Sequence, residues 1–509
     1  MLRFLRIFIA ITLILSAVNL CQADHWNQFR GPGGSGIADG CSPPVRIGED
    51  SLTWRVEVPQ GHSSPALSTD HIFLTAIEDD RLITLAFEKE TGRLAWRKEA
   101  PKVKIERIHE TSSPASSTPY VDTDRVIVYF GSFGLICYDL DGKELWQREI
   151  PTPRSLYGMA TSPIVHGENI ILVLDDENNI EGGKLSQSKV IAVSKQTGET
   201  VWETARPFNR SGWSTPMIWN HDGGQDLVVL GNWRLYGYDP KNGEERWFTE
   251  GFAKETIAVP VAGDGKLYAS ASMLGGAGDE QPDPTPFWES VLQFDKNGDG
   301  RFGRDEISHY FTFPLRPELP LGHPGYGFPL PGETDARRKR QEGYFSWVDD
   351  NKDGFWTKEE LVKRMAVGRG RPVLLAIRPG GSGDVTESHA AWEVNRNIPE
   401  IPSPVYYDGR VYMVRDGGIL SSVDTADGSS VYRKRLNANG HYSASPVVAS
   451  GNIYLVSNKG EISVVKSGDD FVVLHEHDLS EVTYATPAID RSTIYFRTAN
   501  HLAAYRQSE

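Results

Sequence analysis

The sequence predicts an all-β fold: an eight-bladed β-propeller closed by its N-terminal strand, with a small α-helical insertion in blade five. The first observation is a repeated unit that opens on a small residue and proline and continues with short β-branched runs. The second is the spacing of these prolines, which stand 49, 49, 53, 44, 144, 42 and 41 residues apart. Seven spacings define eight units, and the value of 144 marks the insertion. The opening pairs are Ser64-Pro65, Ser113-Pro114, Ser162-Pro163, Thr215-Pro216, Val259-Pro260, Ser403-Pro404, Ser445-Pro446 and Thr486-Pro487.

Most units continue to a glycine turn followed by an aromatic residue, and this pattern predicts the outermost strand of each blade. A large ring at a fixed blade position is expected to pack between neighbouring sheets rather than to form a cofactor or sugar cage. The turns and their rings are Gly92 with Trp96, Gly142 with Trp146, Gly198 with Trp202, Gly243 with Trp247, and Gly428 with Tyr432.

The two ends of the repeat complete each other. Trp54 stands ahead of the first unit, while the last unit stops at Tyr505 without an outer strand of its own. We therefore expect residues 51–58 to supply the outer strand of blade eight, because this closure removes an open sheet edge.

Composition excludes some classes of protein. The 509 residues include 68 acidic and 53 basic ones, a net charge of −15, which disfavours nucleic acid as a partner. A hydrophobic content of 39% is sufficient for a large core. The acidic run Asp175, Asp176 and Glu177 is expected to be a solvated hairpin.

The first 23 residues are typical of a secretory signal peptide. Arg3 and Arg6 precede an apolar stretch, and Cys21 and Ala23 are the small residues before a plausible cleavage site. This predicts a periplasmic or secreted protein with no membrane-spanning segment after cleavage. Cys41 and Cys137 would then remain, and the sequence leaves open whether they form a disulfide.

The insertion contains two acidic loops that fit the EF-hand pattern at every fixed position. Calcium prefers six to eight oxygen ligands, and both loops offer carboxylates, an amide and a backbone carbonyl at the required spacing. We expect two calcium sites with a structural rather than a sensing role. The predicted ligands are Asp295, Asn297, Asp299, Arg301 and Glu306 in the first loop, and Asp349, Asn351, Asp353, Phe355 and Glu360 in the second.

The two loops are far apart along the chain for a pair of EF-hands. Forty-two residues separate Glu306 from Asp349, and the usual Ile of the ribbon between paired loops is replaced by Phe302 and Trp356. These departures argue against intimate pairing.

The insertion is expected between strands two and three of blade five. Loops of this type share a face with the links between blades, because successive turns of an antiparallel sheet alternate ends. The links on this face are rich in polar and aromatic residues, and we interpret them as a rim around the channel mouth that binds a ligand or partner. Its candidate residues are His62, His109, Glu110, Tyr157, Arg210, Trp213, Lys254, His441 and Tyr484.

The Gly-x-x-x-Trp repeat resembles that of the PQQ-like β-propeller family, over residues 51–282 and 371–505. Residues Trp26 to Pro32 are similar to the opening of exported bacterial propellers of this group, including the planctomycete type. The resemblance implies one of two roles: a protein-binding scaffold like BamB, or a quinoprotein dehydrogenase that holds pyrroloquinoline quinone and calcium. The vicinal cysteine pair characteristic of the dehydrogenases has no counterpart here, and Glu110, Glu255 and Glu400 form no recognisable catalytic motif.

The sequence therefore favours binding over catalysis. The predicted function is an exported, calcium-binding scaffold for envelope proteins or a small-molecule ligand at the channel mouth, and the alternative is a PQQ-dependent oxidoreductase. The predicted organisation is a signal peptide at 1–23, an N-terminal segment at 24–50, blades at 51–285, an EF-hand pair at 286–370 and the remaining blades at 371–509.

Overall fold

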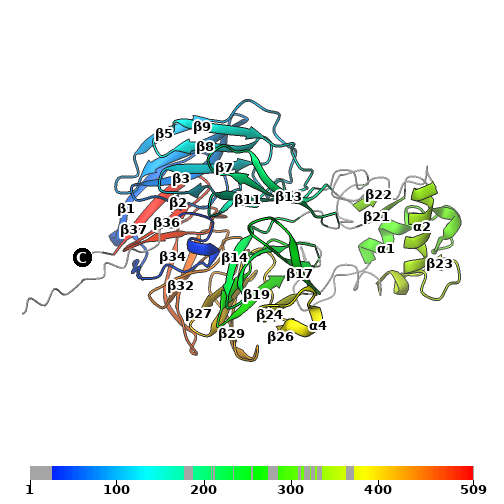
Figure 1. The fold of residues 1–509 in the computed structure, drawn as a ribbon. Coiled ribbons are helices and arrows are strands. Elements are labelled where there is room, and N and C mark those ends of the chain that lie inside the picture. The colour runs from blue at the N-terminus through cyan, green and yellow to red at the C-terminus, as the bar shows by residue number, and fades with distance from the viewer. Residues whose placement is uncertain are drawn as a thin grey trace, which may run out of the picture.

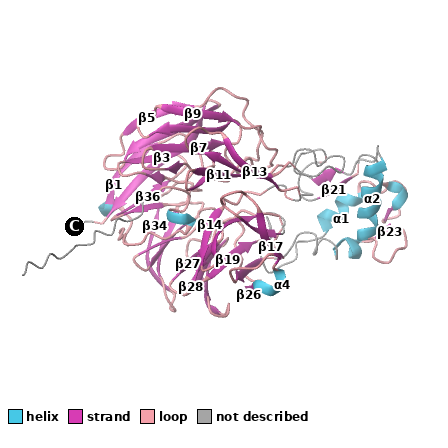
Figure 2. Cartoon of the chain, in the orientation of Figure 1, coloured by secondary structure: helices cyan, strands magenta, loops and turns pink. Residues whose placement is uncertain are grey.

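The computed structural model describes residues 26–507 apart from 177–186, 208, 210–211, 233, 254–255, 273–284, 308–310, 315–320, 322–326, 330–334 and 363–371. Eight β-sheets form a ring, with a small helical module at its side (Figures 1 and 2). The predicted eight-bladed propeller is confirmed. The predicted signal peptide at 1–23 lies outside the described residues. No helix in the described part of the chain is long and apolar enough to cross a membrane.

Each blade is an antiparallel sheet of four strands, which run in chain order from the centre of the ring outward in blades one to seven. Blades one to four contain β2–β5 (Ala66–Leu67, His71–Glu78, Arg81–Glu88, Leu94–Glu99), β6–β9 (Tyr120–Val121, Arg125–Phe130, Gly134–Asp139, Glu144–Glu149), β10–β13 (Ile164–His166, Asn169–Leu174, Lys189–Ser194, Thr200–Ala205) and β14–β17 (Met217–His221, Gly224–Leu230, Arg234–Tyr238, Glu245–Glu250). Blades five to seven contain β18, β19, β24 and β26 (Val261–Gly263, Lys266–Ala271, Val373–Ile377, Ala390–Val394), β27–β30 (Val405–Tyr407, Arg410–Arg415, Ile419–Asp424, Ser430–Arg435) and β31–β34 (Val447–Ala449, Asn452–Val456, Glu461–Lys466, Val472–Asp478).

Blade eight joins the two ends of the propeller. Its inner strands are β35–β37 (Ala488–Asp490, Thr493–Arg497, His501–Arg506), and β1 (Leu52–Glu57) pairs with β37 in antiparallel register, Trp54 opposite Ala504. The predicted closure by the N-terminal strand is confirmed. Blade four gains a fifth strand, because β25 (Gly383–Asp384), which leads into α4 (Thr386–His389), pairs in parallel with β17.

Burial explains the strand sequences. The middle strands lie between two neighbouring blades, so β7 is buried at every residue and consists almost entirely of apolar side chains. The outer strands alternate between exposed and half-buried residues, as β9 does, because only one of their faces meets a neighbouring sheet.

The small residue before each opening proline links one blade to the next. Its backbone N–H donates to the side-chain hydroxyl of the corresponding residue in the following blade, at 2.9–3.0 Å. Seven such bonds connect described residues, and the series is interrupted between blades four and five, where Val259 has no hydroxyl. The donors and acceptors are Ser64 to Thr118, Thr118 to Ser162, Ser162 to Thr215, Val259 to Ser403, Ser403 to Ser445, Ser445 to Thr486, and Thr486 to Ser64.

This hydroxyl ring corrects the start of blade two. The sequence predicts that blade two begins at Ser113-Pro114. In the structure Thr118 occupies the ring position and leads directly into β6, whereas the Ser113 hydroxyl accepts the amide of Ala115 within a local turn.

The Trp residues pack between blades, as predicted. Trp54, Trp96, Trp146 and Trp392 donate their indole N–H groups to backbone carbonyls in the glycine turn of the next blade, at 2.8–3.1 Å. Each ring lies against the glycine of that turn, where a Cβ would come within 2.7 Å of the ring. The glycine of one blade therefore makes room for the Trp of the preceding blade, which explains why the two residues recur together.

The N-terminal segment, residues 26–48 with the short helix η1 (Pro32–Gly34), enters the centre of the ring (Figure 1). Its backbone bonds to the innermost strands of blades one, two and seven, for example from Leu67 N to Trp26 O at 2.7 Å and from Ala38 N to Val448 O at 2.9 Å. Arg30 is fully buried and donates to Pro404 O at the start of blade six. The sequence assigned no place to this segment.

The helical module is inserted between β19 and β24, the second and third strands of blade five. It contains α1 (Thr285–Leu292), η3 (Arg304–Glu306), α2 (Asp335–Val348) and the short strand pairs β20 with β23 (Phe302–Gly303 and Phe355–Trp356) and β21 with β22 (Thr312–Pro314 and Gly327–Pro329). Its own apolar core includes Phe302, Phe345 and Trp356. Because β19 runs from the opposite face toward the blade links, the insertion leaves the propeller on the link face.

Candidate functional site

Several of the predicted rim residues meet one another across neighbouring blades. The His109, Tyr157 and Trp213 rings form a chain over blades two to four, with centroid distances of 5.3 and 5.4 Å. The His62 and Tyr484 rings of blades one and eight lie 4.2 Å apart. Three aromatic contacts on the link face therefore bridge blade boundaries.

The remaining predicted rim residues differ in their surroundings. Glu110 is exposed, and His441 is exposed and lies 2.5 Å from the Asp416 carboxylate in blade six. Trp213 is buried, and its indole donates to the Gly158 carbonyl at 2.9 Å, so it supports the rim rather than facing solvent. Arg210 and Lys254, like Glu255, lie outside the described residues.

Two of the three rim histidines have pKa values shifted in opposite directions. Burial, together with the nearby Arg497 cation, lowers the pKa of His62 to about 4, so His62 is neutral at physiological pH. The hydrogen bond and negative charge of Asp416 raise the pKa of His441 above its usual value and favour the imidazolium.

A buried ion pair that was not predicted from the sequence lies behind the aromatic chain. Asp175 and Arg206 are 2.6 Å apart, with side chains only 1% exposed, and Asp176 accepts the amide of Arg154 at 2.9 Å. The expectation that Asp175 and Asp176 are solvated is wrong, because the link segments of blades three and four cover them. Glu177 lies outside the described residues.

Glu106 is a second functional candidate that the sequence did not indicate. It precedes the chain of rings by three residues. Among the described residues its buried Oε1 atom has no hydrogen-bond partner, and neither has the buried hydroxyl of nearby Tyr129. Burial raises the pKa of Glu106 to about 7, so this carboxyl group exchanges a proton near neutral pH. The sequence signal for this site is the position of Glu106 among the apolar residues Val103, Ile105 and Ile108.

The two acidic loops of the module have matching internal hydrogen bonds. Asp295 accepts the amides of Gly298 and Gly300, and Asp349 accepts those of Asp353 and Gly354. Asn297 and Asn351 each accept the amide two residues ahead, at 2.8 Å. Both sequences therefore fold into the same tight turn.

The last acidic residue of each loop folds over the beginning of the loop. Glu306 Oε1 accepts the amides of Lys296 and Asn297 at 2.7 and 3.2 Å, and Glu360 Oε1 accepts those of Asp350 and Asn351 at 3.0 and 3.2 Å. Among the described residues, no three His, Cys, Asp or Glu side chains are grouped as metal ligands in this conformation. Both loops contain the oxygen atoms that could bind a metal. In this conformation the Glu306 and Glu360 carboxylates accept hydrogen bonds from loop amides instead.

The two loops pair directly, contrary to expectation. β20 and β23 are antiparallel, with Phe302 opposite Trp356 and Gly303 opposite Phe355. The Arg301 guanidinium lies 3.9 Å from the centre of the Phe355 ring, which joins the seventh positions of the two loops. Packing of Phe302 and Trp356 within one core explains how large rings replace the usual aliphatic residue.

Residues 48–180, 186–288 and 383–509 match the family model described as outer membrane protein assembly factor BamB. The chain belongs to this family. The matched ranges cover the propeller apart from β24 and omit most of the acidic module, so the module is an addition to the BamB-type repeat.

Two solved structures with TM-scores of 0.50 and 0.51 agree with the fold of this BamB-family propeller. BamB from Moraxella catarrhalis is 11% identical with a TM-score of 0.50, over 90% of this chain and 98% of its own. The computationally designed Ika8 protein is 8% identical with a TM-score of 0.51, over 89% and 98% of the two chains. A europium-containing methanol dehydrogenase is 11% identical with a TM-score of 0.47, over 87% and 89%. No curated protein is significantly similar to the chain in sequence.

Proposed function

We propose that this BamB-family protein is an exported scaffold that holds an envelope protein or a small ligand on its link face. We further propose that it binds two calcium ions in its module. The single observation that supports the calcium sites best is the matched folding of two loops that carry the EF-hand residues in direct contact with each other. Membership of the BamB family supports the scaffold role and the periplasmic or secreted location.

The donor set of both loops fits calcium. Asp295, Asn297, Asp299 and Glu306 supply side-chain oxygens and Arg301 a backbone carbonyl, and the second loop repeats this set with Asp349, Asn351, Asp353, Glu360 and Phe355. Gly300 and Gly354 adopt positive φ values of 76° and 88° at the sharp turn, which favours glycine. When calcium binds, the carboxylates of Glu306 and Glu360 would give up their hydrogen bonds to the loop amides and coordinate the metal.

Calcium in this module is expected to stabilise structure. Extracellular calcium modules bind with Kd values of about 10⁻⁴ to 10⁻³ M and remain filled where calcium is abundant. The module's core is small and lies between the two loops, so ordering both loops would stabilise that core.

The aromatic contacts that cross blade boundaries support the scaffold role. Aromatic side chains supply large contact areas at interfaces, and the ring pairs at His62 with Tyr484 and His109 with Tyr157 are only half-buried. A partner that covers these rings would bury apolar area without moving the blades.

Calorimetry with Ca²⁺ tests the calcium sites. Glu306→Gln and Glu360→Gln should each abolish one site, whereas the matched controls Asp305→Asn and Glu359→Gln alter exposed neighbours in the same loops and should bind normally. Two sites that persist in the double variant Glu306→Gln/Glu360→Gln would contradict the proposal.

Affinity capture from envelope extracts tests the scaffold. Alanine substitution of His109, His441 and Tyr484 should release partners retained by the wild type, with and without chelator, while substitutions on the opposite face should not. Unchanged capture by these variants would overturn the link face as the binding surface. Dye reduction after addition of quinone and calcium would instead establish the oxidoreductase alternative.

A further inference from the structure

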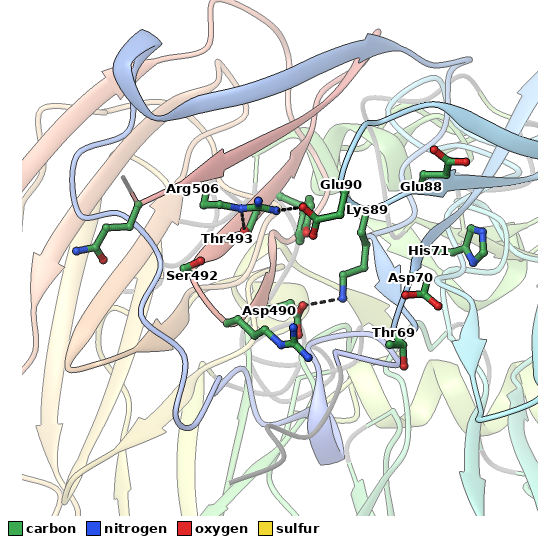
Figure 3. Close-up of a pocket in the computed structure, with 13 residues that line it drawn as sticks. Thr69, Asp70, His71, Glu88, Lys89, Glu90, Asp490, Ser492, Thr493 and Arg506 are labelled. Carbon is green, nitrogen blue, oxygen red and sulfur yellow. Dashed lines mark hydrogen bonds and ion pairs between the residues drawn. The ribbon is translucent and has the colours of Figure 1, made fainter. Parts of the chain in front are cut away.

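A cavity of about 570 Å³ lies between blades one and eight, on the face opposite the blade links (Figure 3). Its walls come from the β2–β3 and β4–β5 turns of blade one and from the β35–β36 turn and the end of β37 of blade eight. Small-molecule sites commonly measure about 300–1,000 Å³, so the volume suits a ligand larger than a single amino acid.

A buried ion pair forms the floor of this seam cavity. Lys89 Nζ lies 2.6 Å from Asp490 Oδ2 and donates to Ser68 O at 3.1 Å, and both charged side chains are less than 10% exposed. In Figure 3 this pair spans the gap between the two blades. The two charges neutralise each other, so the floor is rigid and has no net charge.

The boundary between blades two and three has an equivalent ion pair. Lys195 Nζ pairs with Asp122 at 2.7 Å, as Lys89 pairs with Asp490. There, however, Arg125 reaches across the boundary and donates to Lys195 O at 2.8 Å while pairing with Asp124.

Blade eight lacks this filling side chain. Arg125 is the first residue of β7, and Thr493 is the first residue of β36. The cross-strand partners correspond as well, Asp139 for Arg125 and Arg506 for Thr493. Thr493 is too short to cross the boundary and accepts Arg506 Nε at 3.0 Å, so this position of blade eight does not reach blade one as Arg125 of blade two reaches blade three.

The charges around the cavity are paired with two exceptions. Arg506 pairs with Glu90 at 2.9 Å, and Glu88 pairs with Arg93. Within the described part of the chain, the Asp70 carboxylate in the blade-one wall and the Arg491 guanidinium in the blade-eight wall make no hydrogen bond or ion pair, and both are exposed. One wall thus offers an anion and the other a cation.

We infer that the seam cavity binds a short peptide with free termini, its ammonium group toward Asp70 and its carboxylate toward Arg491. A ligand with only one charge would leave one of these groups without a partner, whereas a zwitterion satisfies both. The hydroxyl group of half-buried Ser492 is available for its backbone.

Calorimetry with tri-alanine, N-acetyl-tri-alanine and tri-alanine amide tests this inference. Tri-alanine should bind, and each cap should weaken binding by about tenfold or more, since one charge-assisted hydrogen bond is lost. Arg491→Ala should weaken tri-alanine but not tri-alanine amide, and Asp70→Asn should weaken tri-alanine but not the acetylated peptide.

Matched variants distinguish peptide binding in the cavity from indirect effects of substitution. Thr493→Arg copies Arg125 and should abolish binding, while Glu168→Gln and Thr123→Ala change the corresponding turns at the filled boundary and should leave binding unchanged. Should Thr493→Arg unfold the protein, the Arg491 and Asp70 variants decide the outcome. Undetectable binding of tri-alanine, or equal binding of capped and free peptides, would overturn the inference.

Discussion

The backbone N–H of Thr486 in blade eight donates to the hydroxyl of Ser64 in blade one at 3.0 Å. This bond closes the hydroxyl ring at the point where the two ends of the propeller meet. It also gives a physical reason for the Ser or Thr before each proline, because the hydroxyl satisfies a buried amide that the proline-bounded strand leaves unpaired. The ring is interrupted at Val259, so a substitution that adds a hydroxyl there can be compared with one that removes a hydroxyl elsewhere in the ring.

Ser64→Ala should destabilise the propeller by about 1–3 kcal/mol, because the amide of Thr486 would be buried without an acceptor. Val259→Thr should change the unfolding free energy by less than about 1 kcal/mol, since the new hydroxyl can accept the amide of Thr215. Chemical denaturation measures both. A loss in Val259→Thr as large as that in Ser64→Ala would mean that the ring has no role in stability.

Asp175→Asn should cost about 3–5 kcal/mol, because the change leaves the buried Arg206 charge uncompensated. The double variant Asp175→Leu/Arg206→Met removes both charges and should recover most of that loss. Equilibrium unfolding of the three proteins checks this. Equal stability of the wild type and Asp175→Asn would show that the pair is solvated after all.

Glu106 should make stability fall as pH rises. Its folded-state pKa of about 7 lies above the usual 4.5, so between these values the folded protein binds more protons than the unfolded chain. Glu106→Gln should therefore gain stability relative to the wild type from pH 4.5 to 7, and the gain should level off above pH 7. Thermal melts over this range measure it, with Glu110→Gln, an exposed neighbour, as the control.

Calcium should perturb the amides that the loop glutamates now occupy. Addition of Ca²⁺ should shift the amide resonances of Lys296, Asn297, Asp350 and Asn351, because Glu306 and Glu360 release these groups to bind the metal. Transverse-relaxation-optimised spectra of ¹⁵N-labelled protein report the shifts. If these four amides stayed in place on addition of Ca²⁺, the two glutamates would not be calcium ligands.

The repeat and its closure could be predicted from the sequence because they depend on local signals. Glycine turns, Trp positions and the proline spacing each recur, and the missing outer strand follows from counting. The start of blade two could not be chosen correctly from spacing. Only the contact between Thr118 and its neighbours distinguishes it from Ser113.

The remaining errors concern contacts between residues that are distant in sequence. Asp175 has the composition of a surface turn, and its burial depends on Arg206 in the next link. Phe302 and Trp356 could be recognised as a pair only once the chain between the loops had folded back. The seam cavity depends on which residue occupies one equivalent position, Arg125 or Thr493, in two different blades.

The passage of residues 26–48 through the centre of the ring has a consequence for the order of folding. Cys41 Sγ accepts the amide of Arg491, a contact between residues 450 positions apart, and Leu67 binds the same segment from blade one. During synthesis residues 26–48 therefore emerge long before the last blade, which completes their binding surface. Such long-range closure is slow. A chain that stops before blade eight leaves residues 41–42 without their contacts to Arg491, so complete docking of the N-terminal segment marks the completion of the ring.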